Sequence, residues 1–152
     1  MSVRLEAEEA WQLVAAAHTG ILVTLRRDGV PIALPMWFVA LDRQIYVRTL
    51  TRSKKMARVR RDPRVSFLVE EGERWAELRA VHLTGRVEVV ADGSLVGRLE
   101  QEMQRKYAGF TTARAAMPGA TRRHYEQQFA FLRIVPDERF ISWDNRKLTR
   151  RS

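Results

Sequence analysis

Residues 20–41 read GILVTLRRDGVPIALPMWFVAL, and this stretch decides the fold. Its first part is rich in branched and apolar residues, which favour a β-strand over residues 21–25. Asp28 and Gly29 then predict a tight hairpin, because glycine adopts a positive φ without steric cost. The apolar residues 31–41 predict one returning strand. The segment therefore predicts an antiparallel hairpin at the start of a mainly β domain.

The rest of the chain continues as strands joined by turns, with helices at the flanks. Further strands are expected at residues 45–49, 65–70, 75–90 and 129–142, with Gly85 as a bulge or close-contact point. Helices are expected at residues 5–17, 51–61, 93–106 and, in two short pieces, 108–128. We expect one domain over residues 1–152, mainly β with flanking helices, that forms an antiparallel barrel and carries a helical insert at about 93–128.

The composition is globular and excludes several kinds of chemistry. The 152 residues include no cysteine, which excludes disulfides, thiol catalysis and cysteine-ligated metals. The three histidines lie far apart in the sequence, so no metal site is expected. There is no glycine-rich phosphate loop and no nucleophile elbow, so an enzyme of this sequence needs a cofactor to carry its chemistry. The acidic N-terminal stretch and the lack of a long apolar run predict a cytoplasmic protein without membrane contact.

Positive charge is concentrated in one segment. The net charge is +9, and residues 43–64 hold nine basic residues and one acid, Asp62. Within this segment a strand delivers Thr49 to a turn where Ser53, Lys54 and Lys55 begin a helix. Free backbone N–H groups at a helix start favour an anion, so these four residues predict a phosphate cradle. A solvated basic helix and an electrostatic footprint for nucleic acid are the alternatives.

Two aromatic stretches supply flat apolar surfaces. One is Pro35-Met-Trp-Phe38 within the second predicted strand, and the other is Ser142-Trp-Asp-Asn-Arg-Lys147 near the C-terminus. Such side chains either wall an aromatic ring system or form ordinary core. The pattern alone leaves both possibilities open.

Several stretches together resemble one known family. Residues 20–25, 28–31 and 35–39, the run from Ser53 to Val65 and the strand residues 83–90 are similar to the pyridoxamine 5′-phosphate oxidase-like, flavin-binding split-barrel superfamily. The ending from Ser142 to Leu148 resembles its flavin/deazaflavin oxidoreductase branch. The resemblance covers roughly residues 8–148, and the run from Ser53 to Val65 is its most specific part.

The resemblance implies a six-stranded antiparallel split β-barrel that forms a homodimer, with two cofactor sites at the interface. It implies that the cofactor phosphate is bound by Thr49, Ser53, Lys54 and Lys55. It implies that the cofactor ring is lined by Pro35, Met36, Trp37 and Phe38, with Val47 and Arg48 beneath it. For the partner chain that closes the pocket, the expected residues are Trp75, Arg79 and Trp143. The insert is expected to cap the substrate pocket through Tyr107, Phe110, Met117 and Tyr125.

The same resemblance indicates an oxidoreductase that transfers a hydride to a small organic substrate. The cluster of basic residues exceeds the need of one phosphate, which favours the deazaflavin coenzyme F420 over FMN by a small margin. Arg48, Arg79 and Tyr107 are candidates to polarise the acceptor, and no catalytic residue is assigned. The chain lacks the longer arginine- and histidine-bearing C-terminal motif of members that oxidise pyridoxamine phosphate, so vitamin B6 oxidation is not expected. The alternatives are an FMN flavoprotein, a non-catalytic flavin or nucleic-acid binder, and a haem protein.

Overall fold

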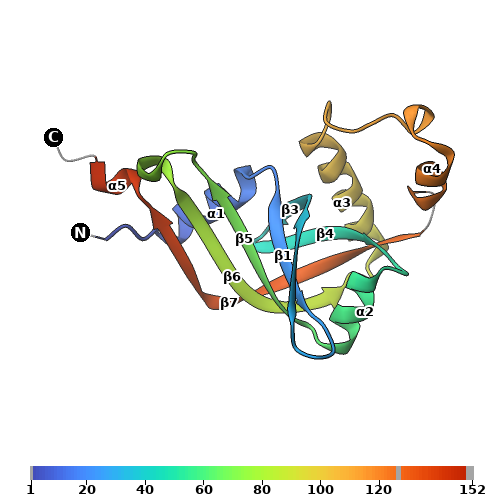
Figure 1. Cartoon of the computed structure of the whole chain (residues 1–152), viewed down its shortest axis with the longest axis horizontal. Coiled ribbons are helices and arrows are strands. Elements are labelled where there is room, and N and C mark those ends of the chain that lie inside the picture. Colours follow the sequence, from blue (N-terminus) through green and yellow to red (C-terminus); the bar gives the residue numbers. More distant parts are fainter. Residues whose placement is uncertain (1, 126–127, 150–152) are drawn as a thin grey trace.

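A computed structural model describes residues 2–125 and 128–149, without the side chains of Arg114 and Tyr125. The strands are β1 (Gly20–Leu25), β2 (Pro31–Met36), β3 (Phe38–Leu41), β4 (Gln44–Leu50), β5 (Arg64–Glu71), β6 (Arg79–Val89) and β7 (Phe129–Asp144). The α-helices are α1 (Ala7–Ala16), α2 (Lys54–Arg61), α3 (Gly93–Lys106), α4 (Gly119–Tyr125) and α5 (Arg146–Thr149), with 3-10 turns η1 (Trp75–Glu77) and η2 (Arg114–Ala116). Figure 1 shows the curled sheet with helices around it.

The seven strands form one antiparallel sheet in the order β2-β1-β5-β6-β7-β4-β3. The two edge strands, β2 and β3, are joined in the chain by a single residue, Trp37. Because one continuous segment forms both edges, the sheet has to curl until its edges meet at Trp37. This geometry confirms the predicted split-barrel fold.

The strand count is seven rather than the six expected, because residues 31–41 do not form one strand. The break at Trp37 lets β2 pair with β1 while β3 turns away to pair with β4. The long strand expected at residues 75–90 also starts later than predicted. Its first residues form η1, in which the Trp75 carbonyl accepts a hydrogen bond from the Asn145 side chain at 2.7 Å.

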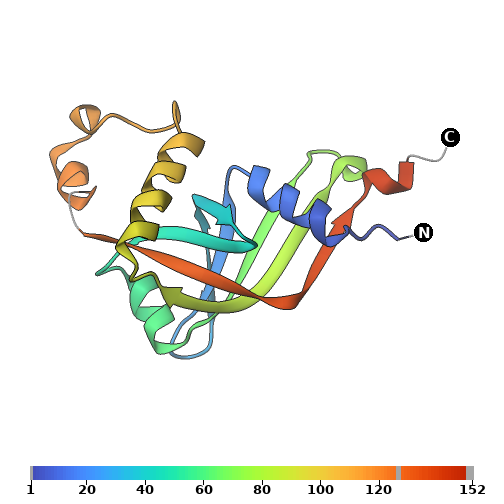
Figure 2. The same cartoon turned by 180° about the vertical axis from the view of Figure 1, so that it is seen from behind.

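Two hydrophobic clusters fill the two sides of the curled sheet. The larger lies inside the curl, where Leu13 and Val14 of α1 pack among strand residues such as Phe67 and Leu132. The smaller lies outside, where Leu99 of α3 packs on Tyr46 and Phe131. Figure 2 shows α1 lying across the sheet and α3 beside the β3–β4 side. Consequently alternate residues of β4 face different environments.

Gly85 marks a register shift between β6 and β7, as the sequence predicted. A Cβ atom built on this residue would lie 2.3 Å from the backbone oxygen of Val135. The close approach of the two strands therefore requires glycine here. Along β7, residues 129–134 pair with β4 and residues 132–144 pair with β6, so the strand passes from one neighbour to the other.

Candidate functional site

The break between β2 and β3 is held by Tyr107 at the C-terminal end of α3. Trp37 stacks on the Tyr107 ring, with centroids 4.1 Å apart and planes at 4°. The Tyr107 hydroxyl accepts a hydrogen bond from the Phe38 N–H at 2.9 Å and lies 2.8 Å from the His18 carbonyl oxygen, to which it donates. Tyr107 is buried, so it is a structural residue rather than the expected open wall of a pocket. The insert thereby fixes the orientation of Trp37.

A cleft of about 520 Å³ opens beside Trp37, between the sheet and the insert. Its lining combines aromatic rings with a thioether, two hydroxyls and a guanidinium, from Trp37, Arg48, Phe110, Thr111, Thr112, Met117 and Phe129. Trp37 and Arg48 were expected to line the cofactor ring, and Phe110 and Met117 to cap the substrate. The structure brings these two groups to one cleft. The side chain of Tyr125, expected in the same cap, lies outside the described residues.

Arg48 is the one charged residue among the described side chains that line the cleft. Its guanidinium carbon lies 3.8 Å from the centroid of the Phe129 ring. Its Nε lies 3.0 Å from Glu100 Oε1 of α3, close enough for an ion pair, but the Nε is buried and makes no aligned hydrogen bond. The Arg48 guanidinium donates no hydrogen bond to any described residue. The guanidinium is thus held in place but retains its hydrogen-bonding capacity.

The residues predicted to bind the phosphate lie together where β4 leads into α2. The Ser53 hydroxyl caps α2 by accepting a hydrogen bond from the Met56 N–H at 3.1 Å. Buried Thr49 supports this serine, with the two hydroxyl oxygens 3.1 Å apart. Among the described residues, the backbone N–H groups of Lys54 and Lys55 have no acceptor, as expected for the first positions of a helix. These donors point to a site for an acceptor-rich or anionic group.

Lys55 lies within this cradle without a neutralising partner. It is half-buried, and no carboxylate of the described residues forms an ion pair with it. Burial, and to a smaller extent the nearby Arg58, lowers the pKa of Lys55. A bound anion would stabilise the ammonium and reverse this shift. Lys54 is exposed at the start of the same helix.

The remaining ring-lining predictions fall into two environments. Pro35 is exposed and Met36 half-exposed at the end of the edge strand β2. Phe38 and Val47 are both 0% exposed, with their side chains in the larger core cluster. Phe38 and Val47 can therefore meet a ligand only through their backbone. The alternation of β4 places Val47 and Thr49 inside the curl and Arg48 outside.

Trp75, Arg79 and Trp143 lie at the opposite end of the molecule from the cleft (Figure 1). Phe129 and Trp143 stand near the two ends of β7, a span of up to about 46 Å at about 3.3 Å per residue. Trp75 is 67% exposed, and Arg79 forms an ion pair with Glu71. Within one chain these three residues do not join the cleft. Their predicted role requires a second copy.

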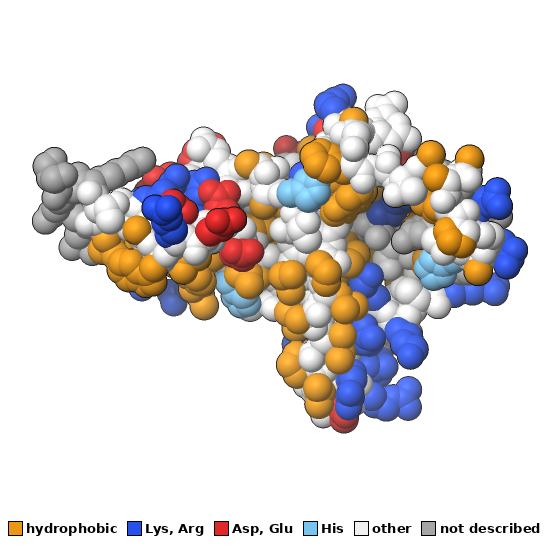
Figure 3. Space-filling model, turned by 45° about the horizontal axis from the view of Figure 1, so that its top comes forward, with side chains coloured by type: hydrophobic (Ala, Val, Ile, Leu, Met, Phe, Trp, Pro, Cys, Tyr) orange, Lys and Arg blue, Asp and Glu red, His pale blue; other side chains and the backbone are white. Residues whose placement is uncertain are grey.

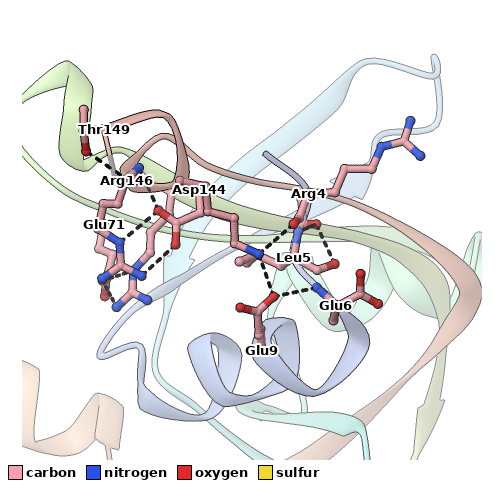
Figure 4. Close-up of polar contacts among 11 residues, drawn as sticks. Arg4, Leu5, Glu6, Glu9, Glu71, Asp144, Arg146 and Thr149 are labelled. Atoms are coloured by element: carbon pink, nitrogen blue, oxygen red, sulfur yellow. Dashed lines mark hydrogen bonds and ion pairs between the residues drawn. The ribbon is translucent and has the colours of Figure 1, made fainter. Parts of the chain in front are cut away.

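A network of ion pairs fixes this opposite end. Buried Asp144 lies 2.6 Å from a terminal nitrogen of Arg146, which lowers the pKa of the Asp144 carboxyl. The Lys147 ammonium lies 2.8 Å from Glu9 of α1, and the Ser142 hydroxyl accepts a hydrogen bond from the Leu5 N–H at 3.0 Å. Figure 4 shows the contact between Asp144 and Arg146 and, near it, Glu9 of α1 with its own contacts. The C-terminal segment carrying Trp143 is therefore rigid.

Sequence reasoning missed three contributors to the site: Glu100, Lys106 and Phe129. Lys106 is half-buried, donates a hydrogen bond to the Phe38 oxygen at 2.9 Å and lies 3.7 Å from the Phe38 ring centroid. Burial lowers the pKa of Lys106 to about 8. No motif distinguishes these residues, since their roles depend on the packing of the insert against the sheet. The sequence pattern predicted only secondary structure here, a helix around Glu100 and Lys106 and a strand around Phe129.

No group of three or more histidine and acidic side chains in residues 2–125 and 128–149 is placed to hold a metal ion. No helix in this part of the chain has the length and apolar character needed to cross a membrane.

The family model of pyridoxamine 5′-phosphate oxidase matches residues 7–141, most of the chain. The chain belongs to this family. As a member of the pyridoxamine 5′-phosphate oxidase family it has the split-barrel fold of a flavin-binding family that includes oxidoreductases. No curated protein matches the sequence.

Solved structures agree with this membership. The conserved hypothetical protein Rv2991 from Mycobacterium tuberculosis is 32% identical, with a TM-score of 0.82, over 97% of this chain and 90% of that one. An FAD-binding protein from Mesorhizobium loti is 24% identical, with a TM-score of 0.66, over 88% and 91% of the two chains. An F420 reductase is 22% identical, with a TM-score of 0.66, over 90% and 98%. The last two show the shared fold.

Proposed function

We propose that this protein is an oxidoreductase that binds coenzyme F420, or FMN in second place, and transfers a hydride to a small organic substrate. The observation that carries the proposal is half-buried Lys55, which has no described carboxylate partner and stands beside two free N–H groups at the start of α2. Burying an unpaired ammonium is unfavourable, and a bound phosphate removes that cost. Membership of a flavin-binding family supports the same assignment.

The choice between the two cofactors rests on charge. Beyond the cradle, α2 carries Arg58, Arg60 and Arg61, and Asp62 is the nearest acid in the sequence. Figure 3 shows Lys and Arg side chains gathered beside the protruding β1–β2 hairpin, where α2 lies. One phosphate does not need this number of cations. Coenzyme F420 adds a polyglutamate tail, and each charge-assisted hydrogen bond to it contributes about 1.5–3 kcal/mol.

A homodimer completes the proposal. The edge strand β2 exposes apolar residues, including Leu34, and the far end of the sheet exposes Ile141, Trp75 and Trp143. Figure 3 shows hydrophobic side chains along the hairpin and along the β6–β7 end beside it. An uncovered apolar edge strand favours association. A partner that covers these surfaces would bring its Trp75, Arg79 and Trp143 to the cleft of the first chain.

In the proposed reaction the protein binds the cofactor and the substrate, orients them relative to each other, and excludes water. The reduced cofactor, F420H2 or FMNH2, would supply the hydride and become oxidised to F420 or FMN. Ser53, Lys54, Lys55 and the helix N-terminus would hold the phosphate, and residues 35–38 with Arg48 would line the ring. Trp37, fixed by Tyr107, orients the ring relative to the cleft, and Phe110 and Met117 exclude water from it. Transfer then depends on positioning and not on a protein acid or base.

Parallel titration with coenzyme F420 and FMN, followed by cofactor fluorescence at two salt concentrations, tests the proposal. We expect submicromolar to micromolar binding of F420 and at least a tenfold loss for Lys55→Ala, equal to about 1.4 kcal/mol. Affinity should also fall as the pH rises through the pKa of Lys55, because the ammonium binds the anion.

Arg105→Ala is the matched control. Arg105 is exposed on α3, and its replacement removes one positive charge, as Lys55→Ala does. Tight binding of FMN alone would identify an FMN flavoprotein. If neither cofactor bound below about 100 μM, about −5.5 kcal/mol, the oxidoreductase proposal would fail. Unchanged affinity in Lys55→Ala would remove the phosphate cradle from it.

A further inference from the structure

We infer that the cleft beside Trp37 binds planar ring compounds that carry a carboxylate, with Arg48 as the anchor for that carboxylate. As a statement about the substrate, this inference rests on the proposed function. As a statement about ligand binding, it depends on the cleft alone. It goes beyond the cofactor assignment, which places Arg48 and residues 35–38 at the ring but names no substrate group for Arg48 to bind.

The geometry of Arg48 carries the inference. The guanidinium is fixed between the Phe129 ring, 3.8 Å away, and Glu100, which lies 3.0 Å from the Nε edge. Its two terminal nitrogens donate to no described residue. The side chain is 33% exposed and lines the cleft. A fixed guanidinium with two free terminal NH₂ groups matches the two oxygens of a carboxylate.

The other polar candidates for an anchor are already engaged. The Tyr107 hydroxyl accepts from the Phe38 N–H at 2.9 Å and donates within the protein, and its ring is covered by Trp37. Arg79 lies at the far end of the sheet and pairs with Glu71. Of the three residues that the sequence suggested as polarising groups, Arg48 alone faces the cleft within this chain.

The walls of the cleft define the rest of the ligand. Trp37 and Phe129 offer flat faces whose orientations are fixed by stacking on Tyr107 and Arg48. Phe110 and Met117 add apolar surface from the insert, and Phe110 is 63% exposed at the edge. A volume of about 520 Å³ suits one small ring compound beside the cofactor. The described lining contains no carboxylate, and Glu100, which lies beside the anchor, is ion-paired to Arg48 itself.

Glu100 acts on this anchor as a positioning residue. Its ion pair is with the Nε edge, so both terminal nitrogens remain without a partner among the described residues. Glu100→Gln keeps the size and an acceptor oxygen, whereas Glu100→Ala removes the contact. Because Glu100 opposes an anion electrostatically while it orients the guanidinium, we expect Glu100→Gln to retain the carboxylate preference and Glu100→Ala to reduce it.

The test compares 2-naphthoate with its neutral isostere 2-naphthamide by equilibrium titration of the full-length protein without added cofactor. The acid should bind at least tenfold more tightly than the amide, and Arg48→Met should bring the two affinities within twofold. Arg133→Met is the matched control. Arg133 lies 5.5 Å from the Tyr46 ring centroid, pairs with Glu88, and is 28% exposed outside the cleft lining.

Each outcome decides the inference. Equal binding of acid and amide by the unmodified protein would overturn it, as would a preference that survives Arg48→Met or disappears equally in Arg133→Met. Circular dichroism and the melting temperature establish that each variant is folded. If Arg48→Met does not fold, Arg48→Lys replaces it, because lysine keeps the positive charge but lacks the two terminal NH₂ groups. Competition between 2-naphthoate and saturating F420 would also overturn it, because the cleft would then be the ring site itself. If naphthoate bound without competition but neither cofactor bound, the proposed function would fail and the cleft assignment would stand.

Discussion

Replacing Tyr107 by phenylalanine tests how the insert holds the site. The substitution keeps the ring that stacks on Trp37 but removes the hydroxyl that bridges α3 to the β2–β3 break. The Phe38 N–H, which donates to this hydroxyl at 2.9 Å, then has no acceptor in a residue that is 0% exposed. The Phe38 oxygen keeps its hydrogen bond from Lys106, so the orphaned donor is the main cost.

The magnitude follows from these partners. An unsatisfied buried donor costs about 1–3 kcal/mol, and the lost hydrogen bond to the His18 carbonyl about 1 kcal/mol more. Since His18 is exposed, water replaces part of that second contribution. We therefore expect Tyr107→Phe to lower the free energy of unfolding by about 2–3 kcal/mol. For a chain of this size that loss lowers the melting temperature by roughly 5–10 °C.

Urea denaturation followed by circular dichroism measures this difference, with Tyr46→Phe as the control. The Tyr46 hydroxyl is also hydrogen-bonded, to Gln44 at 3.1 Å and from Arg133 at 3.2 Å, but both partners can reach water. The control should lose less than about 1 kcal/mol. A loss below about 0.5 kcal/mol for Tyr107→Phe, or a loss no greater than that of the control, would show that this hydroxyl does not hold the strand break.

Two further predictions concern the strand register and a buried charge. Gly85→Ala places a Cβ 2.3 Å from the Val135 oxygen and should lower the free energy of unfolding, measured in urea, by about 1–3 kcal/mol. The control, Gly97→Ala, lies in an open position of α3 and should raise the free energy of unfolding by about 0.5–1 kcal/mol. Equal effects of the two substitutions would refute the close approach of the strands. For Lys106, burial lowers the pKa from 10.5 to about 8, so the unfolded chain binds more protons between these values and stability rises with pH relative to Lys106→Met. The full pKa shift corresponds to about 3.4 kcal/mol. Because the ammonium is partly solvated, we expect the stability of the protein relative to Lys106→Met to rise by about 1 kcal/mol between pH 7 and pH 10. A stability difference that stays constant or falls with pH would contradict the burial of the Lys106 ammonium.

Features that depend on interactions between residues close in the chain could be predicted from the sequence. The helix over residues 93–106 and the cap at Ser53 were predictable, because periodicity and capping act within a few residues. The contact between the Thr49 and Ser53 hydroxyls at the start of α2 was predictable for the same reason, because the two residues are close in the chain. The division of residues 31–41 was not, because every residue there has strand character and only the closure of the sheet selects Trp37 as the break.

The sequence by itself determined the antiparallel hairpins, the basic segment with its helix start, and the exclusion of cysteine chemistry, because these depend on local residue types. Only the tertiary structure decided that Arg48, Phe129 and Phe110 meet at one cleft and that Trp143 stands at the other end of β7. Phe38 and Val47 show the reason. Their apolar character suits a core or a ring pocket equally, and the curling of the sheet directs both side chains inward while it leaves Arg48 facing the cleft.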